Sequence, residues 1–133
     1  MNCKQMCGAI EELLDKINHT DDQCYTSLYL HRIYLNFEEL IEFYLAKNKI
    51  FVEHDGAYHK IILKYFINET ATNGFISENL YALFEELRGF RHIFVKRSDI
   101  WCFDEIKLDT LKQKILKQKS DFSRLLEETF YDI

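Results

Sequence analysis

SENLYALFEELRGFRHIFVKRSD, residues 77–99, is the stretch of the chain that most clearly indicates its fold. Its apolar side chains recur at spacings of three and four, which places them on one face of an α-helix. They are Leu80, Leu83, Phe84, Leu87, Phe90, Phe94 and Val95. The stretch therefore predicts an amphipathic helix that buries this face against a core, with Ser77 as its N-cap.

The second half of the same stretch carries a cluster of basic and imidazole side chains. They are Arg88, Arg91, His92, Lys96 and Arg97, in a protein whose formal net charge is −5. The acidic total argues against non-specific binding of nucleic acid over the whole surface. The local reversal of sign instead indicates one confined site for an anionic partner.

Length and composition describe one globular domain, residues 1–133. Hydrophobic residues make up 47% and charged residues 29% of the chain, and it contains no Pro and only four Gly. So few chain breakers favour an all-α fold. The apolar runs are shorter than the roughly 20 residues of a membrane span, and the N-terminus turns acidic too early for a secretory signal. We therefore expect a cytoplasmic protein with no membrane partner.

The four cysteines are expected to be reduced thiols in the core or at the surface. Cys3 and Cys7 lie four residues apart on an expected helix, but no further pair at zinc-site spacing follows them. A Gly-rich phosphate loop and a Gly-x-Ser-x-Gly turn are absent as well. We expect neither a metal ion nor any other cofactor.

Four further helices follow from the same periodicity. We expect them over residues 1–18, from a cap at Thr20, Asp21 or Asp22 to about 48, from 56 to about 69, and over about 109–130. Residues 50–55 are expected to form a loop, and Asn73-Gly74 a turn. The predicted architecture is an up-and-down bundle of about five helices.

Two of these helices have distinctive apolar patterns. The second is apolar over more than one stripe, which is typical of a helix at the centre of a bundle or shared with a second subunit. Its apolar positions are Tyr25, Leu28, Tyr29, Ile33, Tyr34, Phe37, Leu40, Ile41, Tyr44 and Leu45. The third is expected to face inward with Tyr58, Ile61, Ile62, Tyr65 and Phe66.

Several phrases together resemble the HepT-like branch of the HEPN (higher eukaryotes and prokaryotes nucleotide-binding) domains. RGFRH, residues 88–92, resembles the end of that family's motif helix. HRIYLNFEELIE, residues 31–42, resembles its His, Tyr and Glu phrase, and GAYHKIIL, residues 56–63, its aromatic-His phrase. The likeness covers about residues 20–130.

The resemblance implies a helical bundle that forms a homodimer. It also implies a metal-independent endoribonuclease of toxin–antitoxin systems, whose partners are RNA and a nucleotidyltransferase antitoxin. Arg91 stands at the family's Arg, but Lys96 falls where its catalytic His belongs and Ser98 where its Tyr belongs. The family motif is therefore degenerate, and whether this chain cleaves RNA stays open.

RNA cleavage without a metal needs a proton acceptor, a proton donor and a cation for the phosphate. Arg91 can supply the cation, because guanidinium binds phosphate in a bidentate manner. Lys96 could act as a base only if its pKa fell by several units, and a phosphate-binding or solvated lysine is the favoured reading. His92 is a second candidate for the missing histidine, although packing or hydrogen bonding is the favoured role.

Further phosphate-binding candidates are Arg88, Arg97, His31 and Glu38. Glu38 would orient the Arg91 guanidinium by a charge-assisted pair, or would form a structural salt bridge within the bundle, and the sequence does not decide between these. His59 is interpreted as a satisfied histidine at a helix start. Three functions are carried forward: a HepT-like dimer with weakened or lost ribonuclease activity, a non-catalytic module that binds RNA, nucleotide or an antitoxin, and a salt-bridged subunit interface.

Overall fold

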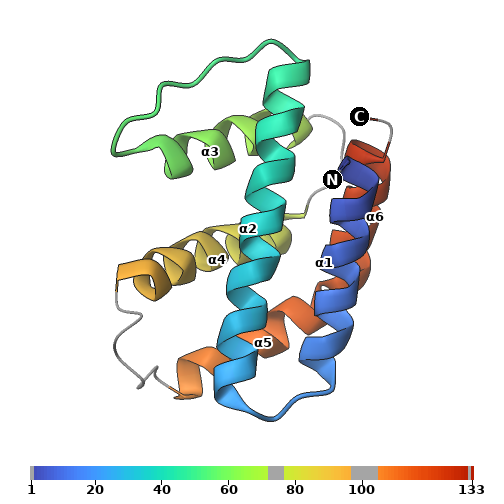
Figure 1. Ribbon diagram of the computed structural model, residues 1–133, viewed down its shortest axis with the longest axis vertical. Coiled ribbons are helices and arrows are strands. Elements are labelled where there is room, and N and C mark those ends of the chain that lie inside the picture. The colour runs from blue at the N-terminus through green and yellow to red at the C-terminus, as the bar shows by residue number, and fades with distance from the viewer. Residues whose placement is uncertain (1, 72–76, 97–104, 132) are drawn as a thin grey trace.

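The computed structural model describes residues 2–71, 77–96, 105–131 and 133, with only the backbone described at residues 71 and 94–96. Within these ranges the chain forms six α-helices and no strand (Figure 1). They are α1 (Cys3–Asn18), α2 (Gln23–Lys47), α3 (Tyr58–Ala71), α4 (Glu78–Lys96), α5 (Glu105–Lys117) and α6 (Lys119–Phe130). The prediction of an all-α bundle is confirmed.

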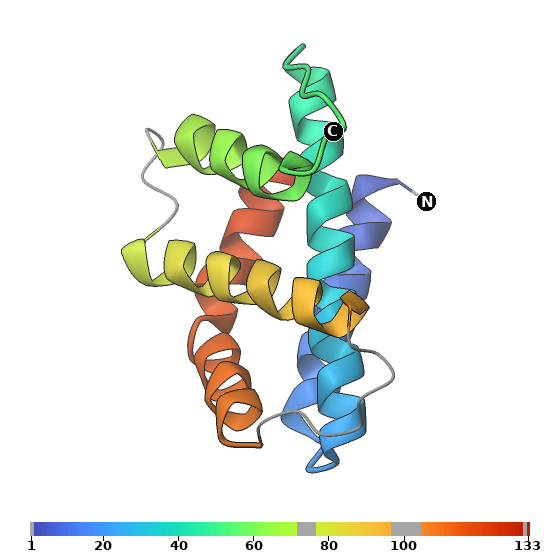
Figure 2. The same ribbon diagram turned by 90° about the vertical axis from the view of Figure 1, so that its left-hand side faces the viewer.

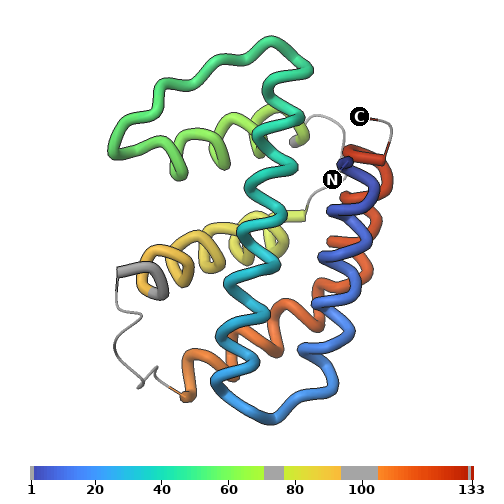
Figure 3. The backbone as a smooth tube through the Cα atoms, in the orientation of Figure 1, coloured from blue at the N-terminus to red at the C-terminus, as the bar shows by residue number. Residues whose placement is uncertain are grey.

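The helices surround α2, which packs against α1, α3, α4 and α5. Figures 1 and 2 show α1, α2 and α6 running along the long axis of the molecule, while α3 and α4 cross α2. The tube in Figure 3 follows this path from α1 down to the α1–α2 turn and back up along α2. The up-and-down order therefore describes α1, α2 and α6, and the crossing of α3 and α4 brings residues of three helices together.

Local signals set both ends of α2. The side chain of Asp22, one of three predicted caps, accepts a hydrogen bond from the Tyr25 backbone N–H at 3.0 Å. At the other end, the N–H groups of Lys49 and Ile50 return to the carbonyls of Ala46 and Leu45. This is the Schellman pattern, and Lys49 occupies its left-handed position with φ of 59°.

The core is centred on Phe37 of α2. Its ring contacts Phe84 of α4, Phe122 and Phe130 of α6, and Phe66 of α3, with ring centroids 4.4 to 6.3 Å apart. All five rings are fully buried. Phe37 therefore joins four helices in one aromatic cluster, which fits the predicted central place of its helix.

The helix predicted from residues 77–99 is α4. Ser77 Oγ accepts a hydrogen bond from the Leu80 N–H at 3.2 Å, as an N-cap residue does. Leu80, Leu83, Phe84 and Leu87 are buried and Phe90 is partly buried. The side chains of Phe94 and Val95 and the Asn73-Gly74 turn lie outside the described residues.

The predicted last helix is two helices, so the count of five was wrong for the part of the chain that the structure describes. α5 ends at Lys117 and α6 begins at Lys119, with Gln118 between them. α5 packs against α2, α4 and α1, whereas α6 packs mainly against α1. Figure 1 shows the two helices running in different directions on either side of this residue.

Two aromatic residues expected among the apolar contacts are exposed instead. Tyr25 is 56% and Tyr65 is 45% exposed. Tyr25 lies at the start of α2, where it stacks on Tyr29 at the edge of the core. The remaining expected inward positions of α3 are buried or partly buried.

Two other local predictions are confirmed. Residues 50–55 form an irregular connection, in which Ile50 and Val52 pack against the core. Cys3 and Cys7 are buried free thiols of α1, and Cys24 is exposed. Burial raises the pKa of the Cys7 thiol to about 12, so this group is an inert core residue.

Candidate functional site

The crossing of α2, α3 and α4 places a carboxylate between a guanidinium and an imidazole. Glu38 lies on the buried face of α2, and its side chain is only 5% exposed. Arg91 comes from the second half of α4, with 18% of its side chain exposed and its Nε 3.8 Å from Glu38 Oε1. The sequence-based pairing of Glu38 with Arg91 is present within one chain.

His59 contacts the same carboxylate oxygen from the first turn of α3. Its Nδ1 lies 2.7 Å from Glu38 Oε1, a short charge-assisted hydrogen bond. The ring is 43% exposed and stands edge-on to Tyr58, whose hydroxyl donates to Glu42 at 2.8 Å. The interpretation of His59 as a satisfied helix-start histidine is therefore incomplete, because His59 is a direct partner of the Arg91–Glu38 pair. Its place in the phrase GAYHKIIL was the sequence feature that could have indicated this role.

Several polar atoms of the Arg91–Glu38 pair and of its neighbour Tyr34 are buried. Tyr34 Oη, Glu38 Oε2 and Arg91 Nε have no hydrogen-bond partner among the described residues. Burial raises the pKa of Tyr34, the Glu38 charge adds to this effect, and the Arg88 and Arg91 charges oppose it. The Tyr34 hydroxyl therefore lies in the field of both guanidinium groups. Leaving a buried polar atom unpaired costs about 1–3 kcal/mol.

His31 is a half-buried neighbour on α2. Burial lowers the pKa of its imidazole, and the positive charges of Arg91 and then Arg32 lower it further. The ring is thus neutral at pH 7. This agrees with the sequence-based grouping of His31 with Arg91.

The remaining predicted site residues are distributed differently. Arg88 is 27% exposed and donates to Glu85 of its own helix from Nε and Nη2, at 3.2 and 3.1 Å. His92 is exposed and contributes no described contact to the Glu38 group. The side chain of Lys96 and all of Arg97 and Ser98 lie outside the described residues. The described site therefore consists of Glu38, His59, Arg91 and His31, with Arg88 beside it.

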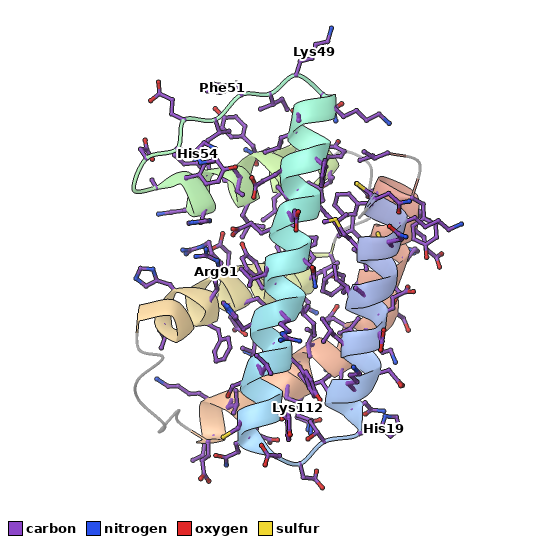
Figure 4. All side chains as sticks on the ribbon, in the orientation of Figure 1. His19, Lys49, Phe51, His54, Arg91 and Lys112 are labelled. Carbon is purple, nitrogen blue, oxygen red and sulfur yellow. The ribbon has the colours of Figure 1, made fainter. Side chains whose placement is uncertain are left out.

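A surface pocket at the far end of α2 has the opposite charge. Its lining includes the acidic residues Asp21, Glu105 and Asp109, together with Lys112, whose Nζ donates to the Thr20 carbonyl. Figure 4 shows Lys112 near the lower end of the molecule and Arg91 well above it, on the same side of α2 as His54. The acidic lining makes this pocket unsuited to an anion.

Comparison of the chain with protein-family models, curated proteins and solved structures gives no match. Over the described ranges, no three or more His, Cys, Asp or Glu side chains are grouped so that they could hold a metal ion. None of the helices in the same ranges combines the length and the apolar character that a membrane crossing requires.

Proposed function

We propose that this chain is a HepT-like helical module that binds RNA through Arg91, and that it descends from metal-independent RNA-cleaving toxins. Its ribonuclease activity is weakened or lost, because Lys96 and Ser98 stand where the family motif has His and Tyr. Two copies form a homodimer, with RNA and a nucleotidyltransferase antitoxin as candidate partners.

The observation that supports this proposal is the partial exposure of Arg91 together with its ion pair to Glu38. Its guanidinium is partly exposed and forms an ion pair with Glu38 of its own chain, with Nε 3.8 Å from Oε1, which favours one orientation of the group before any ligand arrives. A fixed guanidinium is suited to a phosphate oxygen pair. The neutral imidazole of His31 lies close enough for the positive charge of Arg91 to lower its pKa.

A second candidate, a binding module without chemistry, is favoured by the replacement of the motif histidine by Lys96. In this reading Arg88 and Arg91 hold RNA, a nucleotide or the antitoxin, and no bond is broken. Arg88 is the weaker contributor, since its guanidinium already pairs with Glu85.

Titration of fluorescently labelled single-stranded RNA at several salt concentrations tests the proposal. Arg91→Ala is expected to weaken binding about tenfold and to reduce the salt slope by roughly one. Arg124→Ala removes an exposed arginine of α6 and serves as the matched control, with binding unchanged. Equal binding by the wild type and Arg91→Ala would remove the proposed function. Analytical ultracentrifugation of the protein without RNA tests for the homodimer. The expected result is a sedimenting species with twice the mass of one chain.

A further inference from the structure

We propose that His59 and Glu38 form a proton-transfer dyad that replaces the motif histidine missing at Lys96, and that His59 takes the proton of a ribose 2′-hydroxyl. This inference rests on the proposed function, because Arg91 must bring an RNA phosphate to the site.

The hydrogen bond between the two side chains fixes which ring nitrogen is free. A carboxylate beside a guanidinium accepts hydrogen bonds and cannot donate, so the proton of the neutral His59 ring lies on Nδ1, 2.7 Å from Glu38 Oε1. Nε2 then carries the lone pair. It has no hydrogen-bond partner among the described residues, and the ring is 43% exposed. A buried carboxylate that orients an exposed imidazole is the arrangement of a general base.

The same carboxylate also holds the phosphate-binding group. Arg91 Nε and His59 Nδ1 both face Glu38 Oε1, at 3.8 and 2.7 Å. In this proposal a phosphodiester bound by Arg91 has its ribose beside the His59 ring, since both side chains are anchored at one carboxylate oxygen. Among the other groups around the pair, His31 has a lowered pKa and Tyr34 a raised one, which leaves both uncharged at neutral pH. The lowered pKa makes His31 a weaker proton acceptor than an ordinary imidazole, and the raised pKa keeps Tyr34 a phenol, which is not a base.

The proposed step is transesterification. His59 Nε2 takes the proton from the 2′-hydroxyl while the 2′ oxygen forms a bond to phosphorus, and the bond from phosphorus to the 5′ oxygen breaks. The leaving 5′ oxygen takes a proton from water, and His59 later returns its proton to solvent. The products are a 2′,3′-cyclic phosphate and a 5′-hydroxyl, with no change of oxidation state. Arg91 stabilises the extra negative charge on the phosphate during the step.

Cleavage of a labelled single-stranded RNA, with product ends identified by mass, tests the role of His59. His59→Ala is expected to reduce the cleavage rate at least 100-fold while RNA binding stays within about twofold of the wild type. Added imidazole should restore part of the rate in this variant. His54→Ala removes the neighbouring histidine that stacks on Tyr58 and serves as the control, with its rate unchanged. A 2′-deoxy substitution at the cleaved position should stop the reaction.

A second variant tests Glu38 as the positioning residue. Glu38→Gln should lower the rate at least tenfold, and free imidazole should not restore it, because His59 is still present. Nitrogen NMR of the wild-type His59 ring reads its tautomer directly, and the proton should lie on Nδ1. A wild-type ring with its proton on Nε2 would contradict the positioning role.

The failures of the two proposals are distinguishable. RNA binding that depends on Arg91, with no cleavage by the wild type, overturns the dyad and leaves the binding module. Cleavage that is unchanged in His59→Ala overturns the dyad as well. Loss of rate in both His59→Ala and Arg91→Ala, with imidazole rescue of the first alone, is the result that supports it.

Discussion

Glu38 of α2 and His59 of α3 are joined by a 2.7 Å contact between Oε1 and Nδ1, at a carboxylate that is 5% exposed. Arg91 of α4 reaches the same oxygen at 3.8 Å. One buried charge therefore has partners on two other helices, and the crossing of three helices defines the site. Removal of the Glu38 charge should therefore change both the free energy of unfolding and the rate of any reaction at the site.

Glu38→Gln is expected to lower the free energy of unfolding by about 1–3 kcal/mol, because it removes a charged acceptor and leaves Arg91 without its partner. Urea unfolding followed by circular dichroism measures the change. Glu39→Gln removes the adjacent, exposed carboxylate of the same helix and should change stability by less than about 0.5 kcal/mol. Equal effects of the two substitutions would mean that the buried pair contributes nothing.

Stability should depend on pH through His31. Its pKa in the folded protein lies below the ordinary value of 6.5, chiefly because the ring is buried. Below pH 6.5 the unfolded chain therefore binds this proton more readily than the folded one, and stability falls until the folded pKa is passed. His31→Asn should flatten this fall below pH 6.5. Unfolding curves at pH 8, where the ring is neutral in both states, give the packing cost separately, and an unflattened fall would contradict the assignment.

Lys49→Gly should stabilise the protein by up to about 1 kcal/mol. Lys49 has φ of 59° at the end of α2, where a side chain is strained and glycine is not. Lys47→Gly, two residues earlier at the last helical position of α2, is the matched control and should destabilise the protein by up to about 1 kcal/mol. Thermal unfolding measures both, and a loss of stability in Lys49→Gly would show that the strain is not relieved.

Phe37→Ala should destabilise the fold by about 3–5 kcal/mol, because it leaves a cavity where the rings of α3, α4 and α6 meet. Phe51→Ala removes a ring that is 85% exposed and should change stability by less than about 0.5 kcal/mol. Denaturant titration of both variants makes the comparison. A mild effect of Phe37→Ala would mean that the core can close around the lost ring.

The break between α5 and α6 at Gln118 could not be predicted from the periodicity of apolar residues. Leu108, Leu111, Ile115, Phe122, Leu125 and Leu126 are all buried and keep helical spacing across the break. Neither Gly nor Pro marks it. The two segments differ in part in their partners, since α5 packs against α2, α4 and α1, whereas α6 packs mainly against α1. Those partners are far away in sequence.

The sequence by itself determined the helical class, the Ser77 cap and the buried stripe of α4, and it limited the cap of α2 to three adjacent residues, because each depends on residues within a few turns of one another. It also brought Glu38, Arg91 and His31 together as candidates. Only the tertiary structure decided that His59 shares the Glu38 carboxylate and that α3 and α4 cross α2. Such contacts join residues tens of positions apart, and the packing of whole helices, which no local pattern encodes, sets their distances.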